Sequence, residues 1–222
     1  MLNGKNLLDI ESELHLPENR RIIVAYTRAE ILRLKPMYDH LGKQYPSINK
    51  TIKELKNGYD PIEKMKGMKT MIQAGRLQIL NEFFDVLGKK EDPRLQEWKR
   101  SQEYTFSKFC DVGEQLIQIR EPFYVHVAIA VKSISKERGI SIDETVENVQ
   151  YVDAVSRVIH PTREEAEYFL RTYTSLETNI LEYTRRLNTE AVMPTRKAVD
   201  AVQKATIDYK LKEFDRVYED RN

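Results

Sequence analysis

Signals that start α-helices recur along this sequence and constrain its fold more than any other feature. Two of them are capping boxes, SIDE at 141–144 and TREE at 162–165, in which a hydroxyl and a carboxylate satisfy amide donors of the first helical turn. The motif DPIE at 60–63 places a capping aspartate before a proline, and DP at 92–93 repeats that pair. Chain breakers precede these starts, so the boundaries between helices are well marked.

These signals predict an all-α fold, an elongated bundle of about seven or eight helices that ends in two long ones. No internal repeat or long flexible linker occurs, so a single domain is predicted over residues 1–222. Residues 1–18 are a candidate flexible N-terminal arm, and a division near residue 58 or 90 is the alternative. The helices are expected at about 19–36, 47–57, 61–87, 93–120, 122–138, 142–158, 162–188 and 195–220.

Two apolar segments could instead be strands, because periodicity does not distinguish a short strand from a short piece of buried helix. They are Arg21 to Tyr26 and Phe123 to Val131, both rich in β-branched and aromatic residues. Neither has a neighbouring hairpin partner or turn, which favours helix for both. The second segment would then be apolar nearly all round and lie at the centre of the bundle.

The segment after residue 162 shows the clearest helical periodicity. Its apolar residues follow at alternating spacings of three and four, which is typical of a coiled-coil seam. Few paired charges flank the seam, so it is expected to pack within the bundle rather than to form a dimer. The seam comprises Ala166, Phe169, Tyr173, Leu176, Ile180, Tyr183 and Leu187.

The last predicted helix carries two apolar stripes that are rotated from each other by roughly a third of a turn. The first stripe can join the bundle, whereas the second lacks an obvious local partner before the chain ends. Exposed apolar patches mark interaction sites, so the second stripe is a candidate oligomer interface; the alternative is that the bundle wraps around it. This stripe comprises Ile207, Leu211, Phe214 and Tyr218.

Charge is unevenly distributed in a chain whose net charge is only +1. Residues 43–76 hold eight basic residues against three acidic ones, whereas residues 140–190 hold ten acidic against five basic. Within the basic segment, Lys69 and Arg76 lie on or beside an apolar helical face; they can extend to solvent, pair with the acidic segment or contact a phosphate-bearing partner. The candidate surface for an acidic partner comprises Lys53, Lys56, Lys64, Lys66, Lys69 and Arg76.

The sequence shows no pattern that indicates catalysis, cofactor binding or a metal site. Its four histidines lack metal-ligand spacing, and its single cysteine, Cys110, is expected to pack in the core. A stretch at 134–149 that is similar to a helix-turn-helix opens its second helix with acidic residues, which DNA phosphates would repel. No segment is long and apolar enough to span a membrane, and a cytoplasmic location is expected.

We therefore predict a non-enzymatic helical interaction or assembly protein, a scaffold or an adaptor, that forms a homo-oligomer through its C-terminal helix. The alternative is a peripheral protein that binds an anionic membrane surface or a nucleic-acid backbone through residues 43–76. Of these two acidic partners the membrane fits better, because the segment is rich in lysine and poor in the aromatic residues on which bases stack.

Overall fold

The computed structural model describes residues 7–49, 59–77, 93–149, 162–188 and 194–219. These residues form an all-α bundle without strands, as predicted, and both segments with strand-like composition lie inside helices. The bundle ends in two long helices, again as predicted. The described helices are α1 (Leu7–His15), α2 (Pro17–Gln44), α4 (Pro61–Leu77), α6 (Pro93–Arg138), α7 (Ile142–Asn148), α9 (Arg163–Leu187) and α10 (Arg196–Glu219).

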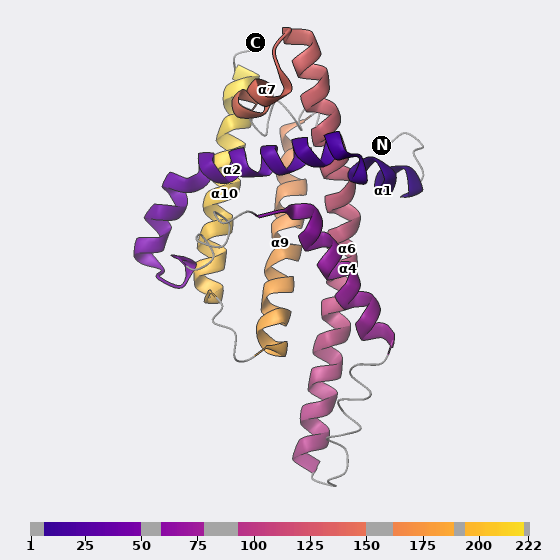
Figure 1. The fold of residues 1–222 in the computed structure, drawn as a ribbon. Coiled ribbons are helices and arrows are strands. Elements are labelled where there is room, and N and C mark those ends of the chain that lie inside the picture. Colours follow the sequence, from indigo (N-terminus) through magenta and orange to yellow (C-terminus); the bar gives the residue numbers. More distant parts are fainter. Residues whose placement is uncertain (1–6, 50–58, 78–92, 150–161, 189–193, 220–222) are drawn as a thin grey trace.

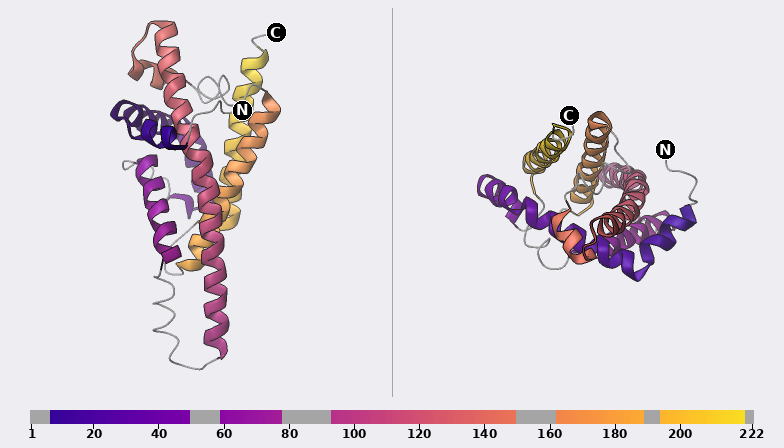
Figure 2. Two further views of the ribbon diagram at one scale, coloured as in Figure 1. Left: turned by 90° about the vertical axis from the view of Figure 1, so that its right-hand side faces the viewer. Right: turned by 90° about the horizontal axis from the view of Figure 1, so that it is seen from above.

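The helices form a layer of three with further helices on one side of it. Helices α6, α9 and α10 run along the length of the molecule, and α9 packs between the other two (Figure 1). Helix α2 crosses this layer, while α4 packs on α6 at one side of α2 and α7 lies at the other side (Figure 2). Helix α2 therefore lies on the outside of the bundle, and this position determines which of its residues face solvent.

The largest cluster of buried side chains draws on every described helix. It includes Leu14 of α1, Ile22 of α2, Val131 of α6 and Phe214 of α10. A second cluster joins α4, α6 and α9, and Cys110 belongs to it as a buried free thiol. A third joins the end of α2 to α10. The predicted seam of α9 packs within the chain, because its residues contact the first two clusters.

Two predicted helix starts, at Asp60 and Thr162, are confirmed in full, and at the predicted capping box 141–144 only the hydrogen bond from the Glu144 amide to Ser141 is present. Asp60 Oδ1 accepts hydrogen bonds from the backbone amides of Ile62 at 2.9 Å and Glu63 at 3.2 Å. Thr162 forms the reciprocal capping box with Glu165. The turn before α7 contains Gly139 at a φ of 65°, a left-handed conformation that glycine adopts without strain.

Two predicted boundaries at prolines are wrong, because both helices continue through the proline. Helix α6 includes Pro122, and α2 includes Pro36 and extends to Gln44. An interior proline removes one hydrogen bond and costs about 3 kcal/mol. Burial on both sides offsets this cost: Leu116 and Val125 of α6 are almost fully buried, as is Leu34 of α2, while Leu41 packs against α10.

The N-terminal segment also differs from the expected flexible arm. Within residues 1–18, Leu7–His15 forms α1, and Leu14 packs into the main cluster with only 2% of its surface exposed. The alternative domain boundaries near residues 58 and 90 lie outside the described residues.

Candidate functional site

The apolar stripe of the C-terminal helix faces the interior of the chain. Ile207, Leu211 and Phe214 belong to the main core cluster, and Phe214 is fully buried. The side chain of Tyr218 lies outside the described residues. The candidate oligomer interface is thus corrected: α9 and α2 pack against α10, so these three side chains are not available to a second subunit.

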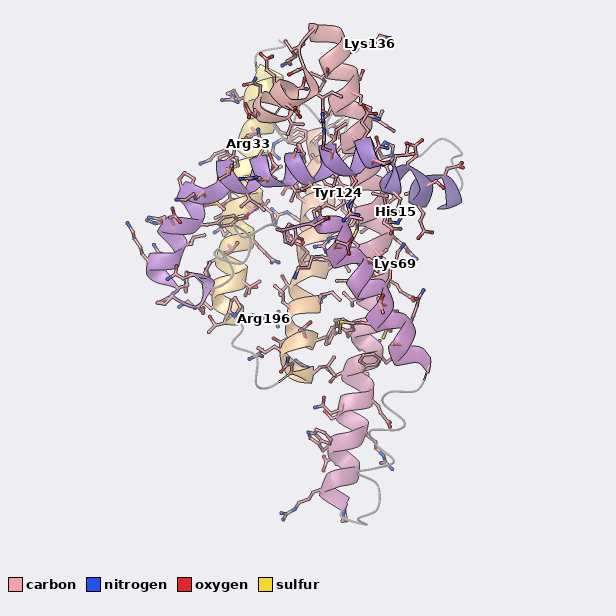
Figure 3. The ribbon with its side chains drawn as sticks, in the orientation of Figure 1. His15, Arg33, Lys69, Tyr124, Lys136 and Arg196 are labelled. Atoms are coloured by element: carbon pink, nitrogen blue, oxygen red, sulfur yellow. The ribbon has the colours of Figure 1, made fainter. Side chains whose placement is uncertain are left out.

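Lys69, the basic residue beside the apolar face of α4, pairs inside the chain. Its ammonium lies 2.5 Å from Glu121 of α6 and 3.4 Å from Glu11 of α1 (Figure 3). Partial burial alone would lower the pKa of Lys69, but the hydrogen bond and charge of Glu121 raise it above its ordinary value. The acids that pair with Lys69 come from α1 and α6 rather than from the acidic segment 140–190, so Lys69 is not free for an acidic partner.

The remaining residues of the predicted basic surface fall into two groups. Lys64 and Lys66 are exposed on α4, and neither forms an ion pair with a described residue. Lys53 and Lys56 lie outside the described residues, as does the side chain of Arg76, although its backbone belongs to α4. Two of the six predicted cations are therefore placed on the surface and available.

A second basic surface, which the sequence prediction missed, lies on the solvent side of α2. We call it the outer face of α2. At the positions furthest from the buried side it combines cations with aliphatic side chains. One acid, Asp39, also lies on this side, and it pairs with Lys35. Leu32 is 56% exposed, and Val24 and Ile31 are half-buried. The outer face comprises Arg21, Val24, Arg28, Ile31, Leu32 and Lys35.

The cations of the outer face are weakly paired. Arg28 is exposed and forms no ion pair with any described residue. Arg21 lies 3.4 Å from Asp143 of α7 in a pair that is exposed on both sides, and Lys35 pairs with Asp39 one turn on. Exposed pairs of this kind contribute about 0–1 kcal/mol and are readily exchanged for another anion. The sequence carries a signal for this face, since Arg21, Arg28 and Lys35 recur at intervals of seven.

A buried polar network joins α6 to α9. Arg120 donates a hydrogen bond from Nε to the hydroxyl oxygen of Tyr173 at 2.8 Å and forms an ion pair with Glu177. Burial, reinforced by the charge of Glu177, raises the pKa of Tyr173 well above its ordinary value, so the hydroxyl stays protonated. Burial likewise raises the pKa of Tyr124 and of Tyr59 beside them. The network satisfies its own charges and fixes the register of the two helices.

A second cluster of charges lies between α2 and α10. Lys210 Nζ lies 3.3 Å from Glu30, and Arg33 lies 3.0 Å from the same carboxylate and donates to the backbone carbonyl of Glu147 in α7 (Figure 3). Glu213 is buried beside them, at 8% exposure. Burial is the main cause that raises the pKa of the Glu213 carboxyl, and the negative charge of Glu30 raises it further.

This raised pKa makes stability depend on pH in a defined direction. Because the folded-state pKa of Glu213 exceeds the unfolded value of 4.5, the folded state binds more protons between the two values. The contribution of Glu213 is fully present below pH 4.5 and is lost as pH rises through the folded pKa. We expect Glu213→Gln to raise the free energy of unfolding at pH 7 and to remove this pH dependence.

Urea unfolding at a series of pH values measures both effects. Glu103→Gln, at an exposed position of α6, is the control and should leave the pH dependence unchanged. A Glu213→Gln variant that is less stable than the wild type at pH 7 would contradict this account of Glu213.

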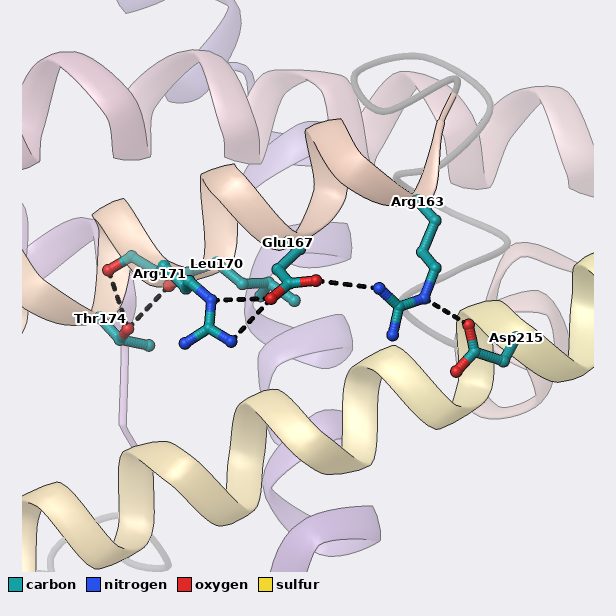
Figure 4. A network of polar contacts seen from close by, with 6 residues as sticks. All are labelled: Arg163, Glu167, Leu170, Arg171, Thr174 and Asp215. Atoms are coloured by element: carbon teal, nitrogen blue, oxygen red, sulfur yellow. Dashed lines mark hydrogen bonds and ion pairs between the residues drawn. The ribbon is translucent and has the colours of Figure 1, made fainter.

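A third network of ion pairs connects the start of α9 to the end of α10 (Figure 4). Arg163 Nε lies 2.6 Å from Asp215, and Arg163 Nη1 lies 2.9 Å from Glu167. Glu167 also accepts from Arg171 one turn further along α9. These charges satisfy one another at the surface, so this network contributes to the attachment of α10 rather than to a free binding surface.

Within the described ranges, no group of His, Cys, Asp or Glu residues has the arrangement of a metal site. A shallow pocket where α9 ends and α10 begins holds about 10 Å³, roughly the space of one water molecule. No described helix is long and apolar enough to cross a membrane. Among the described residues, the outer face of α2 combines cations with aliphatic side chains that are exposed or half-buried, and its ion pairs are weak ones at the surface.

Comparison of the chain with models of protein families, with characterised proteins and with solved structures finds no match in any of the three.

Proposed function

We propose that this chain is a non-enzymatic helical interaction protein that binds an acidic partner through the outer face of α2. The supporting observation is that three cations and an exposed leucine share one side of a surface helix, where the one acid on that side, Asp39, pairs with Lys35. Because the net charge of the chain is only +1, attraction of an anion depends on this local excess. Helix α4 packs on the same side of the three-helix layer as α2 (Figure 2), and it exposes two further cations, Lys64 and Lys66.

Self-association is a weaker proposal for this surface. Two copies that pack α2 against α2 would bring like charges together, which disfavours a symmetric contact at this face. The described residues of the apolar stripe of α10, which the assembly prediction needed, are buried: Ile207, Leu211 and Phe214. The interaction function is therefore proposed with an acidic partner rather than with a second copy of the chain.

Reversal of the three cations tests the proposal. The variant Arg21→Glu, Arg28→Glu, Lys35→Glu should bind inorganic polyphosphate at least about tenfold more weakly than the wild type, because each cation attracts the anion directly. Binding should also weaken as NaCl is raised, since salt screens exposed charges. Isothermal calorimetry measures the affinity, and circular dichroism verifies that the variant is folded. The single change Arg28→Glu breaks no ion pair among described residues and should reproduce part of the loss.

A charge-matched variant is the control. Lys197, Lys204 and Lys212 are exposed on α10, and none of them forms an ion pair with a described residue. Their replacement by glutamate changes the net charge by the same amount as the α2 variant. If both variants lose affinity equally, the attraction is not local to α2 and the proposed surface is wrong.

A further inference from the structure

We infer that the acidic partner of the outer face of α2 is an anionic phospholipid surface. This inference rests on the proposed function, because it concerns the same residues. The face combines two features that such a surface requires. Arg21, Arg28 and Lys35 can contact lipid phosphates, and the aliphatic side chains between them can enter the boundary between headgroups and acyl chains.

The position of α2 fits a helix that lies in the plane of a membrane surface. It crosses the outside of the three-helix layer instead of running within it, so its length can lie along a flat surface (Figure 1). The opposite side of α2 is anchored in the core by Ile22, Ile23 and Tyr26, each at most 2% exposed. Contact with lipid therefore requires no unfolding of the bundle, and the long stems of the cations can follow the aliphatic surface while their charges stay at the phosphates.

The neighbours of α2 set the side from which a membrane can approach. Helix α7 borders one side of α2 and exposes Asp143, Glu144 and Glu147, which anionic lipid would repel. Helix α4 borders the other side (Figures 1 and 2). It exposes Lys64, Lys66 and Met71, and its exposed acid Glu63 pairs with Arg20 of α2. Anionic lipid is therefore expected to approach α2 from the α4 side, where Lys64 and Lys66 are exposed, rather than from the side of the exposed acids of α7.

The same face is poorly suited to nucleic acid. Proteins that bind single strands stack bases on exposed aromatic side chains beside the cations. On the described residues, the large exposed aromatic side chains are Trp98 and Tyr104 of α6, Tyr168 of α9 and Tyr209 of α10. None of them lies on α2 or α4. The outer face offers aliphatic groups instead, which favour lipid over bases.

Co-sedimentation with vesicles tests this inference. The full chain should sediment with vesicles of phosphatidylserine and phosphatidylcholine but not with vesicles of phosphatidylcholine alone. The variant Ile31→Ser, Leu32→Ser should bind the anionic vesicles about tenfold more weakly, because the aliphatic contribution is removed. Its affinity for inorganic polyphosphate should stay unchanged, since the three cations remain. Reversal of those cations should abolish sedimentation.

The outcomes separate this inference from the function on which it rests. Cation-dependent binding of polyphosphate or duplex DNA without sedimentation on anionic vesicles would overturn the lipid surface and leave an acidic partner in place. Vesicle binding that the two serine substitutions do not weaken would also overturn the inference, because charge alone would then explain it. Absence of binding to both polyphosphate and vesicles would remove the proposed function as well. Circular dichroism of the serine variant verifies that a loss reflects binding rather than folding.

Discussion

Replacement of Phe214 by alanine should lower the free energy of unfolding by about 3–5 kcal/mol, the range for removal of a buried aromatic ring. Phe214 is fully buried in the main cluster, where it contributes the largest such side chain of α10. The substitution removes apolar surface from the interior and leaves a cavity between α10 and the helices around it. Chemical denaturation followed by circular dichroism measures the change.

Tyr168→Ala is the control for this prediction. Tyr168 lies on α9 with 74% of its surface exposed, so its loss should change stability by less than about 0.5 kcal/mol. The same experiment distinguishes core from interface. If Phe214→Ala altered the oligomeric state while leaving the unfolding free energy nearly unchanged, the apolar stripe of α10 would face a second subunit and its placement in the core would be wrong.

Replacement of Arg120 by alanine should have the second largest effect, about 3 kcal/mol of lost stability. Loss of one partner of a buried ion pair costs about 3–5 kcal/mol because the other charge is left uncompensated. The lower end applies here, since the side chain of Arg120 is 11% exposed but that of Glu177 is 33% exposed and reaches water. The hydroxyl oxygen of Tyr173 would also lose the hydrogen bond that Arg120 Nε donates to it.

A double-mutant cycle separates the ion pair from simple loss of packing. The cycle compares the wild type, Arg120→Met, Glu177→Leu and the double variant. The double variant removes both charges and should recover much of the stability that each of these single changes loses. Urea unfolding of the four proteins gives the coupling free energy. Strictly additive effects, or a loss of less than about 1 kcal/mol for Arg120→Ala, would show that the network does not hold α6 against α9.

The sequence predicted the features of the fold that depend on neighbouring residues. The start of α9 follows from Thr162 and Glu165, because a capping box satisfies amides within one turn. The seam from Ala166 to Leu187 follows from periodicity, and its location inside the bundle follows from the few charges beside it. Local rules failed at Pro122, where the gain from burial in the centre of the bundle exceeds the cost of the proline.

The candidate site could not be predicted from the sequence, because it depends on contacts between distant parts of the chain. Lys69 pairs with Glu11 and Glu121, which are 58 and 52 positions away in the sequence. No pattern of neighbouring residues predicts such distant partners. The second stripe of α10 could not be assigned to core or surface without the path of α2 across it. For the same reason, the outer face of α2 could be recognised only when its buried side was known.

The central claim is that the outer face of α2 is the binding surface of this protein. It is tested most directly by the ratio of the polyphosphate dissociation constants of the two charge-matched variants, measured in one buffer. The account predicts that glutamate at Arg21, Arg28 and Lys35 weakens binding at least about tenfold more than glutamate at Lys197, Lys204 and Lys212. A ratio near one, or a larger loss from the α10 variant, would contradict it.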